Sequence, residues 1–138
     1  MLTLVGLKDD YTHDGRLLVE DLEGWAQPSA VRQSDNFVAL ARSLKQITAP
    51  VGPLGLASLH ASTVALESGN AQDDSTYTSI ENQLVSFTAQ RDALVAQITP
   101  LLEAAEMHGT PIPDNVANSL IHQAAALLAN VQAYANGL

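Results

Sequence analysis

From residue 29 onward, apolar residues recur at intervals of three and four over most of the chain, which is the period of an α-helix. The first such run covers residues 29–48 and stops before Pro50, because the residue preceding a proline disfavours the α region. Its apolar positions are Val31, Phe37, Leu40, Ala41, Leu44 and Ile47. We predict one amphipathic helix in this segment.

A second helix is predicted over residues 54–68, after the turn-rich connector 51–56 and before the polar loop 69–74. Its apolar repeat consists of Leu56, Leu59, Thr63 and Leu66. A repeat of this kind forms either the core side of a helix or a face for a partner or a second copy. Because leucine and alanine of neighbouring antiparallel helices satisfy one another inside a bundle, we expect internal packing.

The longest apolar repeat begins near Asp74 or Ser75, both good helix caps, and continues to about residue 107. Its positions at alternating spacings of three and four are Tyr77, Ile80, Leu84, Phe87, Arg91, Leu94, Ile98, Leu101 and Ala105. The pattern resembles a heptad seam over about four heptads, and Arg91 alone interrupts it. Pro100 is expected to kink the helix, because proline lacks the amide donor and crowds the preceding turn.

Gly109 is predicted to end that helix, and Asp114 to cap a last one over 114–136. The apolar face of the last helix carries Val116, Leu120, Ala124, Leu127, Val131 and Tyr134. Two long helices joined by a short loop run antiparallel. The predicted fold is therefore all-α, an antiparallel four-helix bundle-like arrangement with a long helical hairpin formed by residues 74–107 and 114–136.

The N-terminal segment is predicted to be irregular. It contains one short helix over residues 17–25, with Leu17, Leu18, Leu22 and Trp25 on its apolar side. We therefore divide the chain into an N-terminal loop and short helix, residues 1–28, and a helical domain, residues 29–138. The apolar start MLTLVGL is too short for a bilayer span or a secretory signal, and we expect it to be the end of an element that begins upstream.

Composition supports the helical assignment and excludes several functions. Apolar residues make up 46% of the 138 residues but aromatic residues only 4%, a composition typical of close-packed helices. The net charge of −9 disfavours nucleic acid and anionic membrane surfaces as partners. The absence of cysteine excludes disulfides, thiolate zinc sites and cysteine nucleophiles.

The stretch DYTHDG offers the one candidate metal site, a partial EF-hand pattern that begins at Asp10. Asp10, Thr12 and Asp14 occupy loop positions one, three and five, and Asp21 occupies position twelve. Aspartate at position twelve makes bidentate capture of calcium harder than glutamate would. Leu18 at position nine supplies no side-chain oxygen. A calcium loop of Asp10, Thr12, Asp14 and Asp21 therefore stays an alternative, and a simple turn is the other interpretation.

The remaining polar residues indicate no catalytic site. His13, His60, His108 and His122 lack the spacing of metal ligands on one helix, and we expect them to be solvated or at the edge of the core. Arg91 is expected to reach an acidic neighbour or water. Glu103 and Glu106 share a helix face, and we interpret them as exposed acidic neighbours.

The first 22 residues, MLTLVGLKDDYTHDGRLLVEDL, resemble the segment that closes the catalytic domain in the alkaline phosphatase superfamily, which includes type I phosphodiesterases and sulfatases. There a helix of the form P-T-x-L-x-L-x-G-L precedes a D-G-x-x-L turn. The matching residues are Leu2, Thr3, Leu4, Gly6 and Leu7, then Asp14, Gly15, Arg16 and Leu18. TYTSIENQLVSFTAQRDALVAQI and LIHQAAALLANVQAYA are similar to the helical C-terminal tail of bacterial members.

The resemblance implies a non-catalytic chain, because the metal ligands and the phosphorylated residue of the family lie upstream of the matched segment. It implies no cofactor. It also implies a phosphatase catalytic domain as partner, beside the possibility of self-association through apolar helix faces, and a secreted or periplasmic location if the parent phosphatase is exported. We therefore expect a helical scaffold or interaction domain, with a calcium-binding helical module as the alternative.

Overall fold

The computed structural model describes residues 18–68 and 74–138. In these two ranges the chain forms helices and no strand, and the all-α helical bundle is confirmed. The elements are the 3₁₀ turn η2 and five α-helices: η2 (Val19–Asp21), α1 (Ser29–Arg32), α2 (Asp35–Thr48), α3 (Pro53–Ser68), α4 (Ser75–His108) and α5 (Asp114–Asn136). None of these helices combines the length and the apolar composition needed to cross a bilayer.

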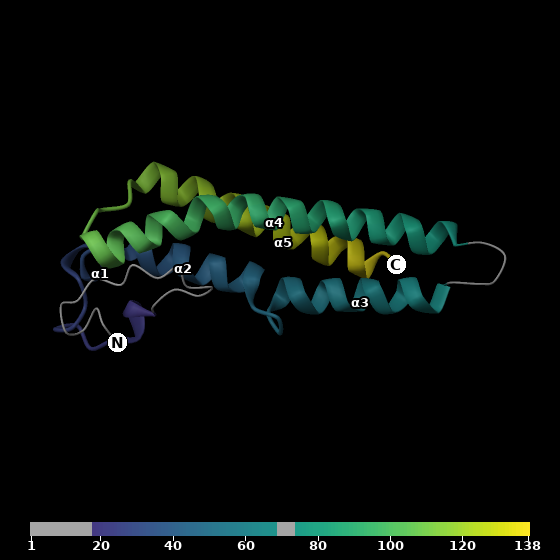
Figure 1. Ribbon diagram of the computed structural model, residues 1–138, viewed down its shortest axis with the longest axis horizontal. Helices are drawn as coiled ribbons and strands as arrows, with labels where there is room; N and C mark the ends of the chain where they lie inside the picture. Colours follow the sequence, from purple (N-terminus) through teal and green to yellow (C-terminus); the bar gives the residue numbers. More distant parts are fainter. Residues whose placement is uncertain (1–17, 69–73) are drawn as a thin grey trace.

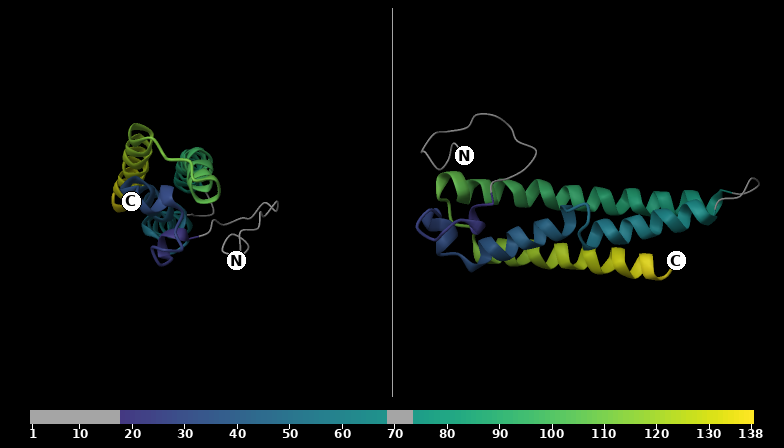
Figure 2. Two further views of the ribbon diagram at one scale, coloured as in Figure 1. Left: turned by 90° about the vertical axis from the view of Figure 1, so that its left-hand side faces the viewer. Right: turned by 90° about the horizontal axis from the view of Figure 1, so that it is seen from below.

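The helices α2 and α3 follow one another along the same side of the bundle, and both contact α4 and α5 (Figure 1). The end-on view in Figure 2 shows α4 and α5 side by side above the column that α2 and α3 form together. The predicted hairpin of α4 and α5 is present, and these two helices run antiparallel. With 34 residues, α4 is about 51 Å long and spans both α2 and α3.

The core lies between α2, α4 and α5 and carries the large apolar side chains. Phe37, Leu40, Ile98 and Leu102 are 0% exposed, and all six predicted core positions of residues 29–48 are buried. The predicted single helix is interrupted, however, at Gln33 and Ser34. The Ser34 hydroxyl accepts a hydrogen bond from the backbone N–H of Phe37 at 3.2 Å, so this serine caps α2 and starts a new helix there.

The predicted end of α4 at Gly109 and the predicted cap of α5 at Asp114 have different outcomes. Gly109 ends α4 with φ of 64°, in the left-handed region that glycine adopts without penalty, as predicted. The prediction that Asp114 caps α5 is wrong, because Asp114 is already the first helical residue and Pro113 is the cap. The Asp114 carboxylate instead accepts a hydrogen bond from the Asn36 side-chain amide, which ties the first turns of α2 and α5 together.

The predicted short helix over residues 17–25 is also wrong for the part that the structure describes. Only the three residues of η2 are helical, and a turn follows in which the Gln27 side chain donates to the Leu22 carbonyl at 2.7 Å. Val19 is 1% exposed and belongs to the core, whereas Trp25 is 85% exposed. The helix predicted to place Leu18, Leu22 and Trp25 on one face is therefore not formed.

The junction between α2 and α3 depends on the absence of a side chain at Gly55. A Cβ atom added there would lie 2.9 Å from the carbonyl carbon of Pro50 and closer still to its oxygen. Both are backbone atoms, so they cannot rotate away as the end of a side chain would. The two helices can therefore follow each other closely only with glycine at position 55.

We predict that Gly55→Ala lowers the free energy of unfolding by about 1–3 kcal/mol, since overpacking against fixed backbone outweighs the better helix propensity of alanine. Chemical denaturation with circular dichroism as the readout measures this change. Gly24→Ala is the matched control, because a Cβ atom at Gly24 meets nothing within 4 Å. Its effect should stay within about 0.5 kcal/mol. Equal stability of the two variants would contradict the close junction.

Candidate interaction surfaces

The structure tests the predicted calcium loop at one residue only. Asp10, Thr12 and Asp14 lie outside the described residues, and Asp21 is the exposed last residue of η2. Among residues 18–68 and 74–138, no group of three or more histidine, aspartate or glutamate side chains could hold a metal ion. The calcium site therefore stays a prediction for the N-terminal segment.

The histidines that the structure describes are exposed and lie on three different helices. His60 is on α3, His108 is the last residue of α4 and His122 is on α5, while His13 lies outside the described residues. Arg91 is half-buried and donates from Nε and Nη2 to the Asp92 carboxylate at 2.9 and 2.7 Å. An ion pair between sequence neighbours that water still reaches contributes little to stability.

The interpretation of Glu103 and Glu106 as two exposed neighbours is wrong for Glu106. Glu103 is exposed, but Glu106 is only 3% exposed. The buried positions of α4 continue through Leu102 and Ala105, so a residue four positions after Leu102 falls on the same inward face. Helical spacing could have revealed this burial.

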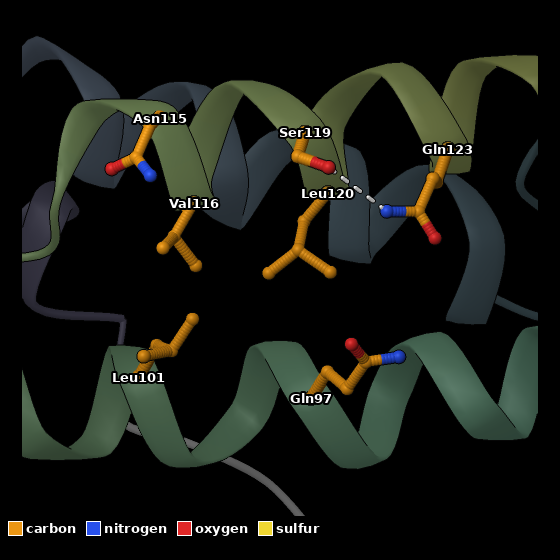
Figure 3. A pocket seen from close by; sticks show the side chains of 7 residues that line it. All are labelled: Gln97, Leu101, Asn115, Val116, Ser119, Leu120 and Gln123. Atoms are coloured by element: carbon orange, nitrogen blue, oxygen red, sulfur yellow. Dashed lines mark hydrogen bonds between the residues drawn. The ribbon is translucent and has the colours of Figure 1, made fainter.

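A groove of about 530 Å³ runs between α4 and α5 (Figure 3). Leu101, Val116 and Leu120 line it with apolar atoms, and Gln97, Asn115, Ser119 and Gln123 line it with uncharged polar groups. The Gln123 amide donates to the Ser119 hydroxyl at 3.1 Å, and the Gln97 amide donates to the Ala93 carbonyl at 3.1 Å. The groove is open to solvent, and these two glutamine amides already have partners within their own helices.

The outer face of α3 carries three exposed leucines. Leu56, Leu59 and Leu66 are 54%, 63% and 72% exposed, and Thr63 lies exposed between them. Isolated exposed leucines are common on proteins, but these four residues follow intervals of three, four and three and therefore form one row along the helix. We call the four residues the α3 outer face.

The prediction that this row forms the inward side of the helix is wrong. The buried residues of α3 are Leu54, Ala61 and Ala65, which lie on the opposite side. Ala61 and Ala65 pack with Ile80 of α4, and Tyr134 of α5 contacts the same cluster. The small alanine side chains let the backbone of α3 lie close to both neighbouring helices, and leucines in the same places would not fit at that separation.

The aromatic pair between α4 and α5 completes this end of the bundle. The rings of Phe87 and Tyr134 meet edge to face, with centroids 5.7 Å apart, a geometry that aromatic pairs favour. Phe87 is buried and Tyr134 is half-buried. Together with Ala61 and Ala65 of α3, these two rings fill the space between α3, α4 and α5 at this end of the bundle. The α3 outer face is therefore not needed to close the core.

Comparisons with known proteins identify no relative: no family model, no curated protein and no solved structure matches this chain. The assignment of function therefore depends on the residues themselves.

We predict that Leu59→Ala changes the free energy of unfolding by no more than about 0.5 kcal/mol, because this side chain is already exposed to water. Leu54→Ala in the same helix is the matched variant, with a side chain only 5% exposed. It should destabilise the protein by about 2–5 kcal/mol through lost burial and a cavity. Denaturant titration measures both. Losses of similar size would show that Leu59 is covered in the folded protein.

Proposed function

We propose that this chain is a non-catalytic helical scaffold and interaction domain that binds another protein surface through the α3 outer face. The observation that carries the proposal is the row of three exposed leucines on a helix whose opposite side already packs into the bundle. The fold does not bury these aligned side chains, so they expose apolar area to water. Binding a partner protein buries that area, which is favourable.

The arrangement of ionisable residues supports a non-catalytic role. General acid–base or nucleophilic catalysis needs a base and its partner within hydrogen-bonding distance. In the described part of the chain, His60, His108 and His122 are exposed on separate helices, and Arg91 forms an ion pair with the neighbouring Asp92. A helical bundle with one apolar outer row is suited to binding rather than to chemistry.

The parent that we propose is a bacterial alkaline-phosphatase-like phosphoesterase, with this chain as the C-terminal part. The support is the sequence resemblance of residues 1–22 to the end of that catalytic domain and of the two long helices to its helical tail. On this proposal the enzyme's metal ligands belong to a region upstream of the matched segment. The α3 outer face then belongs to a domain that packs against the enzyme or mediates association.

We predict that the purified chain hydrolyses neither p-nitrophenyl phosphate nor bis-p-nitrophenyl phosphate, with or without added zinc or calcium. Release of p-nitrophenolate measures the rate. An active phosphatase of this type, assayed in parallel, shows that the conditions support turnover. Metal-dependent turnover that Asp10→Asn or Asp14→Asn removes would overturn the non-catalytic proposal and favour the metal loop as a functional site.

A further inference from the structure

We propose that the α3 outer face pairs with the same face of a second copy of this chain. The two α3 helices run antiparallel, and the two-fold axis crosses the outer face at the level of residue 61 along the helix. The inference rests on the proposed function, because it names the partner of the same surface. A two-fold interface uses one patch twice, so the patch must be complementary to itself. The row on α3 meets this condition in its spacing and its charge, and its size limits the strength of the pairing.

The spacing of the row is unchanged when its direction is reversed. Leu56, Leu59, Thr63 and Leu66 are separated by three, four and three residues. In an antiparallel copy, Leu56 therefore faces Leu66 of the second copy, and Leu59 faces Thr63. Intervals of three and four are those of the a and d positions in helices that pack knobs into holes. Each leucine thus faces a side chain in the row of the second copy, and all four positions have a partner.

The charge of the row is also compatible with a second copy of an acidic chain. The net charge is −9, yet Glu67 is the only acidic residue of α3, and no lysine or arginine lies on this helix. In the antiparallel pair the two Glu67 residues are offset by twelve positions, about 18 Å along the axis. This separation is roughly twice the Debye length at physiological ionic strength, so their repulsion is largely screened. A strongly basic partner would find only Glu67 to attract it.

The size of the row predicts a weak dimer. The 16 residues of α3 span about 24 Å, and only one side of the helix is available. Stable complexes bury about 800 Å² on each partner, more than a single helix face of this length supplies. We therefore expect association only at high protein concentration, or where a larger assembly holds two copies near each other.

Sedimentation velocity from about 1 μM to about 1 mM protein tests the pairing. The sedimentation coefficient of the wild-type chain should rise from the monomer value toward the dimer value over this range. Leu59→Lys should remain monomeric, because pairing would bury a lysine charge next to Thr63 of the second copy. Val85→Lys is the matched control, since Val85 is 63% exposed but lies on α4. It should associate like the wild type.

Chemical crosslinking tests the antiparallel geometry, and the absence of native cysteine makes single-cysteine variants unambiguous. In the proposed pair the two copies of residue 60 lie on the same side of the row, offset by about 3 Å along the axis, whereas the two copies of residue 67 are about 18 Å apart. A short bis-maleimide should therefore join two copies of His60→Cys and leave Glu67→Cys uncrosslinked. Crosslinking of Glu67→Cys, or of neither variant, would overturn the geometry.

The inference and the proposed function can fail separately. A wild-type chain that stays monomeric over the whole concentration range would overturn pairing with a second copy. The same result leaves the non-catalytic proposal in place, because the hydrolysis assay tests that part of the proposed function. The partner of the α3 outer face would then be a different protein. Association that Leu59→Lys and Val85→Lys weaken equally would also overturn the pairing, since the contact would then not be specific to α3.

Discussion

The packing of Ala61 and Ala65 against α4 and α5 determines which residues of α3 reach the surface. These two side chains are 1% and 3% exposed and lie against Ile80, with Tyr134 at the edge of the same cluster. Small side chains allow a close approach of backbones, and a close approach excludes large ones from the same contact. Leu56, Leu59 and Leu66 therefore remain outside, although leucine is the more apolar residue. The proposed interaction surface follows from this choice of inner face.

The junction at Gly55 lets α2 and α3 use different packing along one column. The inner face of α2 carries large side chains such as Phe37, Leu40 and Ile47, whereas the inner face of α3 is built mainly from alanine. A continuous helix could not change its rotation between the two, because its side-chain positions follow a fixed period. The break over residues 49–52 resets that rotation. The absence of a side chain at Gly55 lets the start of α3 lie against the backbone of Ala49 and Pro50.

The sequence predicted the helices well and the orientation of α3 badly, and the reason is physical. In α2 and α5 the polar and apolar residues lie on opposite sides, so the inner face could be identified directly. The α3 segment is apolar or small on nearly every side, and its period carries no information about rotation. The leucine repeat favours the leucine face as the inner one, because leucine and alanine of neighbouring antiparallel helices satisfy one another inside a bundle. The observed contact of α3 with α4 and α5 instead requires small side chains. This requirement depends on the distance to the neighbouring helices, and the sequence of the α3 segment does not specify that distance.

Local surprises elsewhere have similar causes. Past Pro100 the inward position moves from Leu101, which is half-buried, to Leu102, which is fully buried, although α4 continues through the proline. Glu106 is buried because it follows Leu102 by four residues. Trp25 is exposed because the turn around it does not continue the helix that its apolar neighbours suggested. In each case the sequence shows the helical period of the apolar residues. The residue at which this period shifts or stops depends on contacts with other helices.

The most direct test of this account compares the reactivity of two cysteines introduced on opposite sides of α3. With no native cysteine in the chain, Leu59→Cys and Ala61→Cys each provide a single thiol, and both can be labelled at low protein concentration. The account predicts that Leu59→Cys reacts nearly as fast as an unfolded peptide, while Ala61→Cys is protected and reacts only when the bundle opens. Protection of Leu59→Cys together with rapid labelling of Ala61→Cys would contradict the orientation of α3 and, with it, the proposed surface.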